Sequence, residues 1–261
     1  MKARPAASIE VSRLRKQFGA QGVLAIEEAS LSIAPGEFVS VLGPSGCGKS
    51  TLLRCIAGLE VPSSGSVTVN GAPVDGPPER LGMVFQRDAL LDWRNVADNL
   101  MLPIDFRHGD RAAAQSRAAA LLALTGLKGF ENAYPAQLSG GMRQRVAICR
   151  ALVDDPVLLL MDEPFGALDA LTRDQMNVEL QKMWLAEHKT VVFVTHSISE
   201  AIFLGDRVVV FTPRPGRIAD VIQVELPRPR RLAVRGSERF NGYASHIRTL
   251  FEGMGLLKEE A

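Results

Sequence analysis

A glycine-rich segment between an apolar run and a helix-like stretch constrains the fold of this chain of 261 residues more than any other feature. The segment Gly43–Ser50 fits the pattern G-x-x-x-x-G-K-[S/T] and follows the apolar run Phe38–Leu42. That run is long enough for a buried parallel strand and too short for a helix, whereas Lys49–Ala57 has a helical pattern that ends at Gly58. A strand, a glycine-rich loop and a helix in this order favour an α/β fold with a parallel sheet.

The residue types of this segment are those that bind phosphate. Glycines let successive backbone N–H groups turn inward to form an anion nest, and the N-terminus of the following helix adds partial positive charge. Lys49 has the reach to contact the β- and γ-phosphates of a nucleotide, and the Ser50 hydroxyl can ligate Mg²⁺. An accidental glycine-rich turn is the alternative, which the flanking strand and helix disfavour. The predicted phosphate-loop residues are Gly43, Pro44, Ser45, Gly46, Cys47, Gly48, Lys49, Ser50 and Thr51.

Cys47 lies inside the phosphate loop and has two interpretations. The N-terminus of a helix can lower the pKa of a thiol and make it reactive. A small residue that the loop tolerates is the simpler interpretation, and we favour it.

Two carboxylates follow a second buried apolar run. Asp162 and Glu163 come directly after Leu158–Met161, which places them at the carboxyl edge of a parallel sheet, where the phosphate loop also lies. Asp162 is predicted to hold Mg²⁺, directly or through water, and Glu163 to polarise the attacking water. A solvated strand end or a helix cap is the alternative for such a pair, but the phosphate loop upstream favours the catalytic interpretation.

A second glycine pair opens a predicted helix at about residues 141–153. Ser139 and the amides of Gly140 and Gly141, followed by Met142, form a second surface that can bind phosphate. An ordinary serine N-cap with flexible glycines is the default interpretation when no other motif is present.

The remaining chain alternates apolar strands with helices, which is typical of a parallel sheet covered on both faces. Strand-like stretches at Ser8–Leu14 and Leu24–Ile33 form an N-terminal antiparallel β portion. Helices are predicted at 94–102 and 111–125 and, near the C-terminus, at 236–257 as an amphipathic packing helix. The predicted division is a domain 8–230, with its core at 8–86 and 154–230 and a helical subdomain at 87–153, and a C-terminal extension at 231–261.

Two further segments carry specific expectations. One face of the helix at about 170–187 is predicted to belong to the core. The basic, proline-rich segment Pro227–Arg231 is interpreted as a solvated linker. The predicted core residues of the helix are Leu171, Met176, Leu180, Met183 and Trp184.

Composition excludes several classes of protein. Lys and Arg number 30 and Asp and Glu 29, so the net charge is +1, which argues against a general nucleic-acid-binding surface. No apolar run approaches the ~18 residues needed to span a bilayer, and the N-terminus lacks an apolar signal core. Three cysteines are too few and too scattered for a disulfide framework or a four-ligand zinc site. We therefore expect a cytosolic protein that acts at a membrane only through a partner.

The phosphate loop, the glycine pair and the two carboxylates, in this order, resemble the ATPase subunit of ATP-binding cassette (ABC) transporters over nearly the whole chain. The Walker A loop reads GPSGCGKST, the signature LSGGM and the Walker B segment LLLMDEP. The resemblance implies that Gln86 is the Q-loop glutamine, which senses Mg²⁺ and nucleotide and faces a membrane subunit. It implies that Asp169 is the D-loop aspartate and that His196 is the switch histidine, which contacts the γ-phosphate. Phe18 lies where the family places an aromatic ring on adenine, or it is a plain core aromatic.

The same resemblance implies a mechanism for two copies of the chain. In a head-to-tail homodimer, ATP bound by Gly43–Thr51 of one subunit is covered by Ser139–Met142 of the other. The implied cofactors are ATP and Mg²⁺. The implied catalytic residues are Glu163, His196 and Gln86, and the implied metal ligands are Ser50, Gln86 and Asp162.

Finer likeness points to the nitrate/sulfonate/taurine/bicarbonate importer ATPases, a group that also contains cassettes for thiamine precursors. The stretches that carry it are Leu90–Leu100, Met142–Ile148, Met161–Asp169 and Arg207–Arg217. The chain departs from the family pattern at Ser197, where Asp is common, and at Cys149, where Ala is common. The implied partners are an integral membrane permease and an extracytoplasmic solute-binding protein, with this chain on the cytoplasmic face of the membrane.

Two other functions are compatible with the cassette motifs. ABC ATPases of DNA repair or translation usually carry a long coiled-coil insertion or a second cassette, whereas this chain has a short segment between Gln86 and Leu138 and one phosphate loop. A degenerate cassette that only binds nucleotide is disfavoured by Glu163 and His196. The sequence therefore favours an ATP-hydrolysing transport subunit, and it does not identify the solute.

Overall fold

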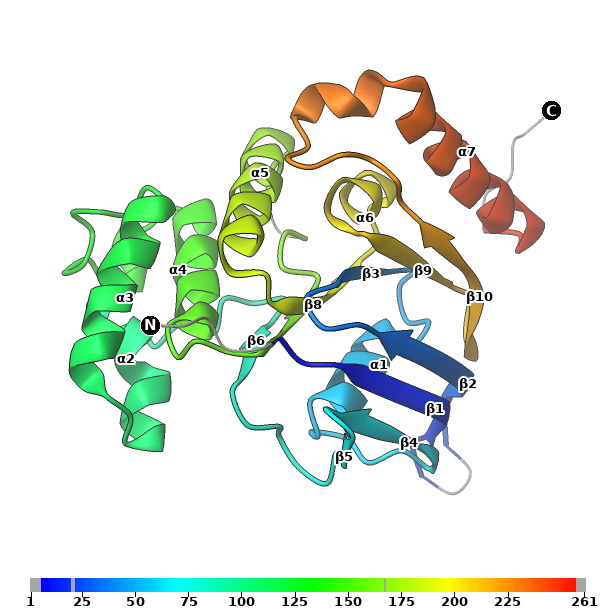
Figure 1. The fold of residues 1–261 in the computed structure, drawn as a ribbon, viewed down its shortest axis with the longest axis horizontal. Coiled ribbons are helices and arrows are strands. Elements are labelled where there is room, and N and C mark those ends of the chain that lie inside the picture. Colours follow the sequence, from blue (N-terminus) through cyan, green and yellow to red (C-terminus); the bar gives the residue numbers. More distant parts are fainter. Residues whose placement is uncertain (1–5, 20–21, 167, 257–261) are drawn as a thin grey trace.

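The computed structural model of the chain describes residues 6–19, 22–166 and 168–256, and within them ten strands form one sheet with helices against both faces (Figure 1). The order of the strands is β5-β4-β1-β2-β10-β9-β3-β8-β7-β6. The strands are β1 (Ile9–Gln17), β2 (Leu24–Ile33), β3 (Phe38–Leu42), β4 (Ser64–Val69), β5 (Ala72–Pro73), β6 (Leu81–Val84), β7 (Leu158–Asp162), β8 (Thr190–Thr195), β9 (Arg207–Phe211) and β10 (Gly216–Gln223). The helices are α1 (Lys49–Ile56), α2 (Val96–Arg107), α3 (Arg111–Leu124), α4 (Gly140–Leu152), α5 (Ala170–Glu187), α6 (Ile198–Leu204) and α7 (Glu238–Gly253), with short 3₁₀ turns η1 (Pro135–Gln137) and η2 (Leu232–Gly236).

The larger part of the sheet is parallel. Strands β9, β3, β8, β7 and β6 pair in parallel register, with Ser40 of β3 opposite Phe193 of β8 and Val208 of β9. Strand β3 is buried along its whole length, as expected for a strand covered on both faces. The prediction of an α/β fold with a mostly parallel sheet is confirmed.

The N-terminal part of the sheet is antiparallel. Strand β1 pairs antiparallel with β2 and with β4, which confirms the predicted antiparallel β portion. Strand β10, which was not among the predicted strands, pairs antiparallel with β9 and parallel with β2 and so joins the two parts. Most residues of β10 are exposed or half-buried, so the segment lacks the continuous apolar run that marks the buried strands.

The helical insertion lies between β6 and β7, where α2, α3 and α4 stand together beside the β6 edge (Figure 1). Helix α2 extends beyond the predicted end at residue 102 because Pro103 does not terminate it. Leu100 and Met101 before the proline and Ile104 after it are all buried in the core, so packing offsets the loss of one backbone hydrogen bond. The helical insertion of the predicted fold is confirmed.

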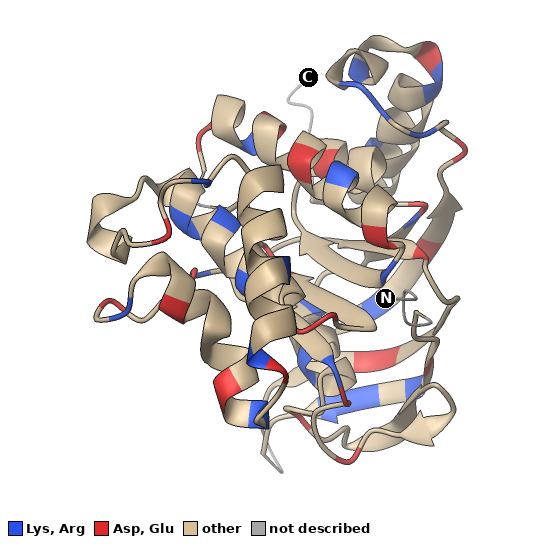
Figure 2. Cartoon of the chain, turned by 60° about the vertical axis from the view of Figure 1, so that its left-hand side comes forward, with Lys and Arg blue, Asp and Glu red and all other residues tan. Residues whose placement is uncertain are grey.

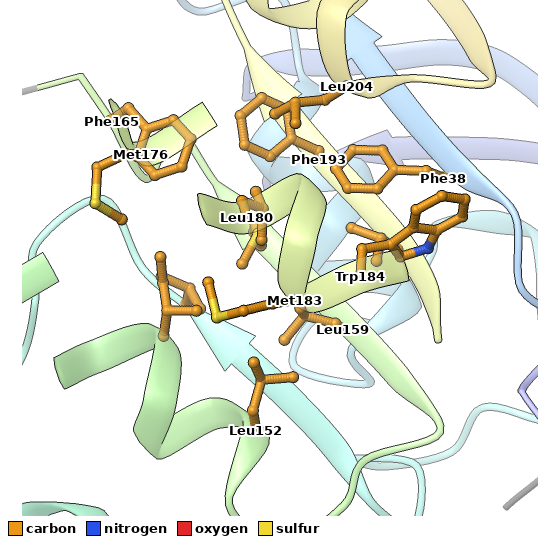
Figure 3. Close-up of a cluster of buried hydrophobic side chains, with 14 of the residues drawn as sticks. Phe38, Leu152, Leu159, Phe165, Met176, Leu180, Met183, Trp184, Phe193 and Leu204 are labelled. Carbon is orange, nitrogen blue, oxygen red and sulfur yellow. The ribbon is translucent and has the colours of Figure 1, made fainter. Parts of the chain in front are cut away.

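Successive residues of β8 divide the core into two layers. Val191 and Phe193 pack in the cluster against α4, α5 and α6, whereas Val192 and Val194 belong to the cluster on the α1 side of the sheet. Side chains of a strand point alternately to the two faces of a sheet, so one strand contributes to both layers. Figure 3 shows the first cluster, in which the ring of Phe193 lies 5.9 Å from that of Phe38 and 5.7 Å from that of Phe165.

One residue of the predicted core is wrongly placed. Met176, Leu180, Met183 and Trp184 are buried, but Leu171 is 84% exposed. Leu171 is the second residue of α5, in the first turn of the helix, before the helix reaches the core cluster.

The interpretation of Pro227–Arg231 as a solvated linker is also wrong for its central residues. The side chain of Arg230 is 3% exposed and donates hydrogen bonds to Ile202 O (2.8 Å) and Gly205 O (2.8 Å) at the end of α6. The guanidinium of Arg228 lies 4.3 Å from the ring centre of Trp184. The segment therefore fastens the C-terminal part of the chain to α6, and α7 packs beyond it with Phe240, Ala244, Ile247 and Phe251 buried.

Basic and acidic residues are interspersed over the visible elements, on strands and helices alike (Figure 2). Some of them tie the helical insertion to the rest of the chain, as Arg117 of α3 does with Glu187 of α5 at 2.6 Å. None of the helices in the described part of the chain combines the length and apolar character needed to cross a membrane.

Candidate functional site

A cavity of about 390 Å³ gathers predicted site residues from distant parts of the chain. Most of the phosphate loop between β3 and α1 lines it, together with Phe18, Gln86 and Glu163. The predicted site residues that do not line it include Gly43, Pro44, Cys47, Asp162 and His196. The carboxyl ends of parallel strands and the N-terminus of a helix meet here, as expected for a site in an open α/β sheet. The residues lining the cavity are Phe18, Val23, Ala25, Ser45, Gly46, Gly48, Lys49, Ser50, Thr51, Gln86, Glu163 and Arg214.

Three of these lining residues were not predicted. Val23 and Ala25 lie opposite Phe18 across the turn between β1 and β2, where the Phe18 amide donates to Val23 O at 3.0 Å. No motif marks them, because their place follows only from strand pairing. Arg214 is the basic residue of the segment Thr212–Pro215. Its position shortly after a buried strand is the sequence signal that could have identified it as a site residue.

The backbone of the phosphate loop requires glycine at Gly48. Its φ is +106°, and a β-carbon would lie 2.7 Å from Ala25 O of β2. Gly48 also precedes the first residue of α1, so the loop leads directly into the N-terminus of the helix. The first backbone N–H groups of a helix have no intrahelical partner, so this place suits an anion.

Lys49 is held across the loop. Its side chain is 3% exposed, and its ammonium donates to Gly43 O and Pro44 O, both at 2.8 Å. The same ammonium lies 3.7 Å from Oε1 of Glu163. The positive charge is therefore fixed between the loop carbonyls and a carboxylate at the cavity.

Ser50 and Asp162 form a pair of oxygen ligands. The Ser50 hydroxyl donates to Oδ1 of Asp162 at 2.8 Å. Burial raises the pKa of Asp162, and the hydrogen bond from Ser50 opposes that rise. In the described ranges no group of three or more His, Cys, Asp or Glu side chains is arranged around a metal site. A hydroxyl beside a carboxylate fits Mg²⁺, which takes one or two protein oxygens and completes its shell with phosphate and water.

Glu163 adopts a backbone conformation that is rare for a side-chain-bearing residue. Its φ is +45°, and its N–H donates to Val194 O of β8 at 2.9 Å. Its carboxylate lies between Lys49 and His196, with Oε2 at 3.2 Å from Nδ1 of the histidine. Such a left-handed residue costs about 1 kcal/mol or more and persists where the surrounding contacts hold it in place.

Residues on both sides of His196 are fixed by a buried hydrogen-bond network. Thr195 Oγ1 donates to Glu200 Oε2 at 2.6 Å and accepts from the Ser197 amide at 3.0 Å. Burial raises the pKa of Glu200, whose side chain lies beneath this turn. Ser197 caps α6 by accepting from the Glu200 amide at 3.3 Å. Serine and aspartate are both good N-cap residues, so the departure from the aspartate that is common in the family keeps the cap.

Phe18 is not a core residue. Its side chain is 39% exposed and lines the cavity, with the Lys16 ammonium 4.9 Å from the centre of its ring. The plain core interpretation is therefore wrong. A ring at this place can offer its face to a planar ligand.

Within the part of the chain that the structure describes, neither the signature residues nor Asp169 line this cavity. Ser139 caps α4 by accepting from the Met142 amide at 3.3 Å. Asp169 caps α5 by accepting from the Thr172 amide at 3.0 Å. Ser139, Gly140 and Asp169 are exposed, whereas Gly141 is buried. The role of these residues at the nucleotide of a second copy stays a prediction.

All three thiols are buried, and burial decides between the two interpretations of Cys47. Desolvation raises the pKa of Cys47 even though the Lys49 ammonium lies 3.9 Å from its sulfur, so the reactive-thiol interpretation is wrong. Burial also raises the pKa of Cys55 to about 11 and that of Cys149 to about 12.

We expect the native chain to react with a thiol reagent at pH 8 at least about 100-fold more slowly than the chain in guanidinium, because only the exposed thiolate is nucleophilic. Absorbance of released thionitrobenzoate measures both rates, and the denatured chain provides the three-thiol endpoint. Rapid modification of one thiol in the native chain would contradict the burial of these sulfur atoms.

The chain is similar to known proteins over most of its length. Residues 26–166, which contain the phosphate loop, the signature and both carboxylates, match the ABC transporter family model. The chain is 46% identical over 254 residues to an uncharacterized ABC transporter ATP-binding protein of Methanocaldococcus jannaschii, covering 97% of this chain and 92% of that protein. It is 50% identical over 217 residues to the taurine import ATP-binding protein TauB of Rhizobium johnstonii, covering 83% of this chain and 82% of that protein.

A solved structure has the same fold. It is a dimeric ATP-binding cassette in a post-hydrolysis state bound to ADP and Pi, with a TM-score of 0.72 and 32% sequence identity. The similarity covers 84% of this chain and 100% of that one.

Proposed function

The chain belongs to the ABC transporter family as an ATP-hydrolysing subunit, and on this premise we propose that it powers the uptake of a small solute, such as a sulfonate or nitrate, through a separate membrane permease. The observation that carries the proposal is the convergence of Lys49, Ser50, Gln86 and Glu163 on one cavity. The similarity to taurine import proteins supports the direction of transport and the class of solute.

The proposed site binds ATP by its base and its phosphates. The exposed ring of Phe18 stacks on adenine, while the phosphate-loop amides and Lys49 hold the phosphates. Lys49 then exchanges its loop carbonyls for phosphate oxygens, because an ammonium binds an anion more strongly than a neutral carbonyl. Ser50 and Asp162, with Gln86 from the cavity lining, would hold Mg²⁺, which would neutralise charge on the phosphate oxygens.

Glu163 is the proposed general base. Its carboxylate is half-buried at the cavity, and its strained backbone fixes the direction of the side chain. His196 contacts the same carboxylate at 3.2 Å, so the histidine orients Glu163 and can reach a γ-phosphate beside it. A base held in this way receives a proton from the attacking water without first reorganising.

A head-to-tail homodimer completes the proposed site. Ser139 and Gly140 are exposed at the N-terminus of α4, which is where the partner's ATP would bind. ATP binding drives closure of the pair, and hydrolysis with product release reopens it and changes the access of the permease.

Helices α2 and α3 argue against a role in DNA repair or translation. They span Val96–Arg107 and Arg111–Leu124 and pack into the core through Leu100 and Leu121. They form no extended arm of the kind that such ATPases use.

We place the chain on the cytoplasmic face of the membrane, with a permease and an extracytoplasmic solute-binding protein as partners.

Transport in a defined host tests the proposal. The chain is expressed with the permease and binding protein encoded beside its own gene, in a host that lacks its own taurine and nitrate importers. Uptake of labelled taurine, an alkanesulfonate or nitrate that requires the intact chain and ATP supports the proposal. If the complex assembles and hydrolyses ATP but accumulates none of these solutes, the proposed solute class is wrong.

The loop at Asp92–Arg94 is the proposed contact with the permease. Trp93 is 74% exposed, whereas Arg94 is tied to Asp105 at 3.3 Å, so Trp93→Ala is the cleaner substitution. We expect roughly 10-fold less stimulation of ATP hydrolysis by the permease, with unchanged ATP affinity, because aromatic anchors dominate interfaces. Val221→Ala on β10 is the control, and normal stimulation of the Trp93 variant would show that the contact lies elsewhere.

A further inference from the structure

The two glycines of the signature have different surroundings. Gly140 is exposed, and the nearest atom to a β-carbon placed there is Nη2 of Arg143 at 3.9 Å. Gly141 is buried, and a β-carbon there would lie 2.6 Å from Cγ2 of Thr172. Neither glycine is among those with a positive φ, so the backbone does not require glycine at either place. Glycine in a helix costs up to about 1 kcal/mol relative to alanine, so each one needs another reason.

Thr172 cannot move its methyl group away without losing other contacts. Its hydroxyl donates to Oδ2 of Asp169 at 2.6 Å, and its amide donates to Oδ1 of the same carboxylate. These bonds hold the pKa of Asp169 below its usual value. Threonine is β-branched and stiff at χ1, so a rotation that removes Cγ2 from Gly141 also breaks the hydroxyl bond to Asp169.

We propose that Gly141 makes room for Thr172 of the same chain and that Thr172, through this contact and its bonds to Asp169, fixes the signature helix against the D-loop. Thr172 and Gly141 are positioning residues. Gly140, which has free space around it, is the glycine that leaves room for the partner's nucleotide. The inference rests on the proposed function, because only in the proposed homodimer do Asp169 and the signature both face a second copy.

The contact has a functional consequence for the homodimer. The N-terminus of α4 carries Ser139, and the N-terminus of α5 carries Asp169. If Thr172 joins the two helix ends, each protomer presents its signature and its D-loop as one preformed surface. The dimer then closes without ordering the two segments separately, which lowers the cost of association.

A double substitution tests the contact between Gly141 and Thr172. Gly141→Ala is expected to lower kcat about 10-fold or more and to lower the melting temperature, because the added carbon overlaps Cγ2. Thr172→Ser removes Cγ2 but keeps the hydroxyl, so the double variant Gly141→Ala/Thr172→Ser is expected to return to within about 3-fold of Thr172→Ser alone. Gly140→Ala is the matched control. Adding Thr172→Ser to it is expected to restore neither kcat nor the melting temperature, because a β-carbon at Gly140 does not contact Thr172. A double variant as impaired as Gly141→Ala would overturn the inference.

Thr172→Val separates positioning from packing. Valine keeps the methyl contact with Gly141 but removes the hydrogen bond to Asp169. In a Glu163→Gln background we expect ATP-dependent dimerisation about 5-fold weaker, with the melting temperature and the ATP affinity of the monomer unchanged. Analytical ultracentrifugation measures the dimerisation. Thr172→Ser, which keeps the hydroxyl but lacks Cγ2, is measured beside it to separate the effect of the hydrogen bond from that of the methyl contact. Dimerisation equal to that of the Thr172 parent would leave only a packing role and refute the positioning role.

These outcomes are distinguishable from failure of the proposed function. If the unaltered chain neither hydrolyses ATP nor dimerises, the proposed function fails, yet recovery of the melting temperature in the double variant still tests the contact. If the unaltered chain hydrolyses ATP but Thr172→Ser rescues neither activity nor stability, only the inference fails.

Discussion

The substitution Glu163→Gln is expected to reduce ATP hydrolysis by about 10³-fold, a loss within the range for removal of a general base. Glutamine matches glutamate in size, so Lys49 keeps its bonds to the loop carbonyls, and the hydrogen bond between Ser50 and Asp162 is untouched. The variant is therefore expected to bind ATP but to lack the proposed general base, together with the carboxylate charge 3.7 Å from the Lys49 ammonium. Steady-state release of phosphate measures the loss.

The same variant is expected to accumulate as an ATP-bound dimer. In the proposed cycle, ATP binding closes the pair and hydrolysis reopens it, so blocking hydrolysis is expected to shift the population toward the closed state. Size-exclusion chromatography with and without ATP detects the shift. The control is Glu225→Gln, whose parent side chain is 70% exposed and does not line the cavity. Undiminished turnover in the Glu163 variant would refute the catalytic role, and a variant that stays monomeric with ATP would refute the dimer cycle.

The parts of this fold that sequence predicted correctly have determinants that are contiguous in the chain. Phe38–Leu42 is apolar throughout because it is covered on both faces, and the glycines and Lys49 that follow it form one local turn. The same holds for Leu158–Asp162, where the strand and its terminal carboxylate occupy neighbouring positions. Local pattern therefore located both halves of the cavity, although 112 positions separate Ser50 from Asp162.

The errors arose where burial depends on a distant segment. Leu171 fits the helical pattern, but it lies in the first turn of α5, before the helix reaches the core, and its side chain is exposed. Arginines in a proline-rich segment suggest solvent, yet Arg230 finds backbone carbonyls of α6, 25 to 28 positions earlier in the chain. Val23 and Ala25 reach the cavity only because the β1–β2 pairing brings their turn beside the phosphate loop. Sequence periodicity carries no information on which loop lies next to which.

Arg230 gives the largest expected effect on stability. Burial and the nearby Arg228 lower the pKa of its guanidinium to about 10, so the group is still charged at neutral pH. It donates to Ile202 O at 2.8 Å, Phe203 O at 3.0 Å and Gly205 O at 2.8 Å. These carbonyls lie at the C-terminal end of α6, where helical carbonyls have no intrahelical partner. The guanidinium thus serves as a cap for α6 supplied by a distant part of the chain.

Arg230→Ala is expected to lower the free energy of unfolding by about 3–5 kcal/mol, because it leaves several buried carbonyls without donors and removes a packed side chain. Arg230→Lys should recover little, since one ammonium cannot match a planar guanidinium whose Nη1 bonds the α6 carbonyls while Nε and Nη2 bond Leu226 O and Val224 O. The matched control is the adjacent Arg231→Ala, an exposed arginine expected to change stability by no more than about 0.5 kcal/mol. Urea unfolding followed by tryptophan fluorescence measures the difference. Trp184 of α5 reports on this region because it lies beside Arg228, which belongs to the same segment as Arg230. Equal stabilities of the two alanine variants would show that the C-terminal part of the chain is not fastened through Arg230.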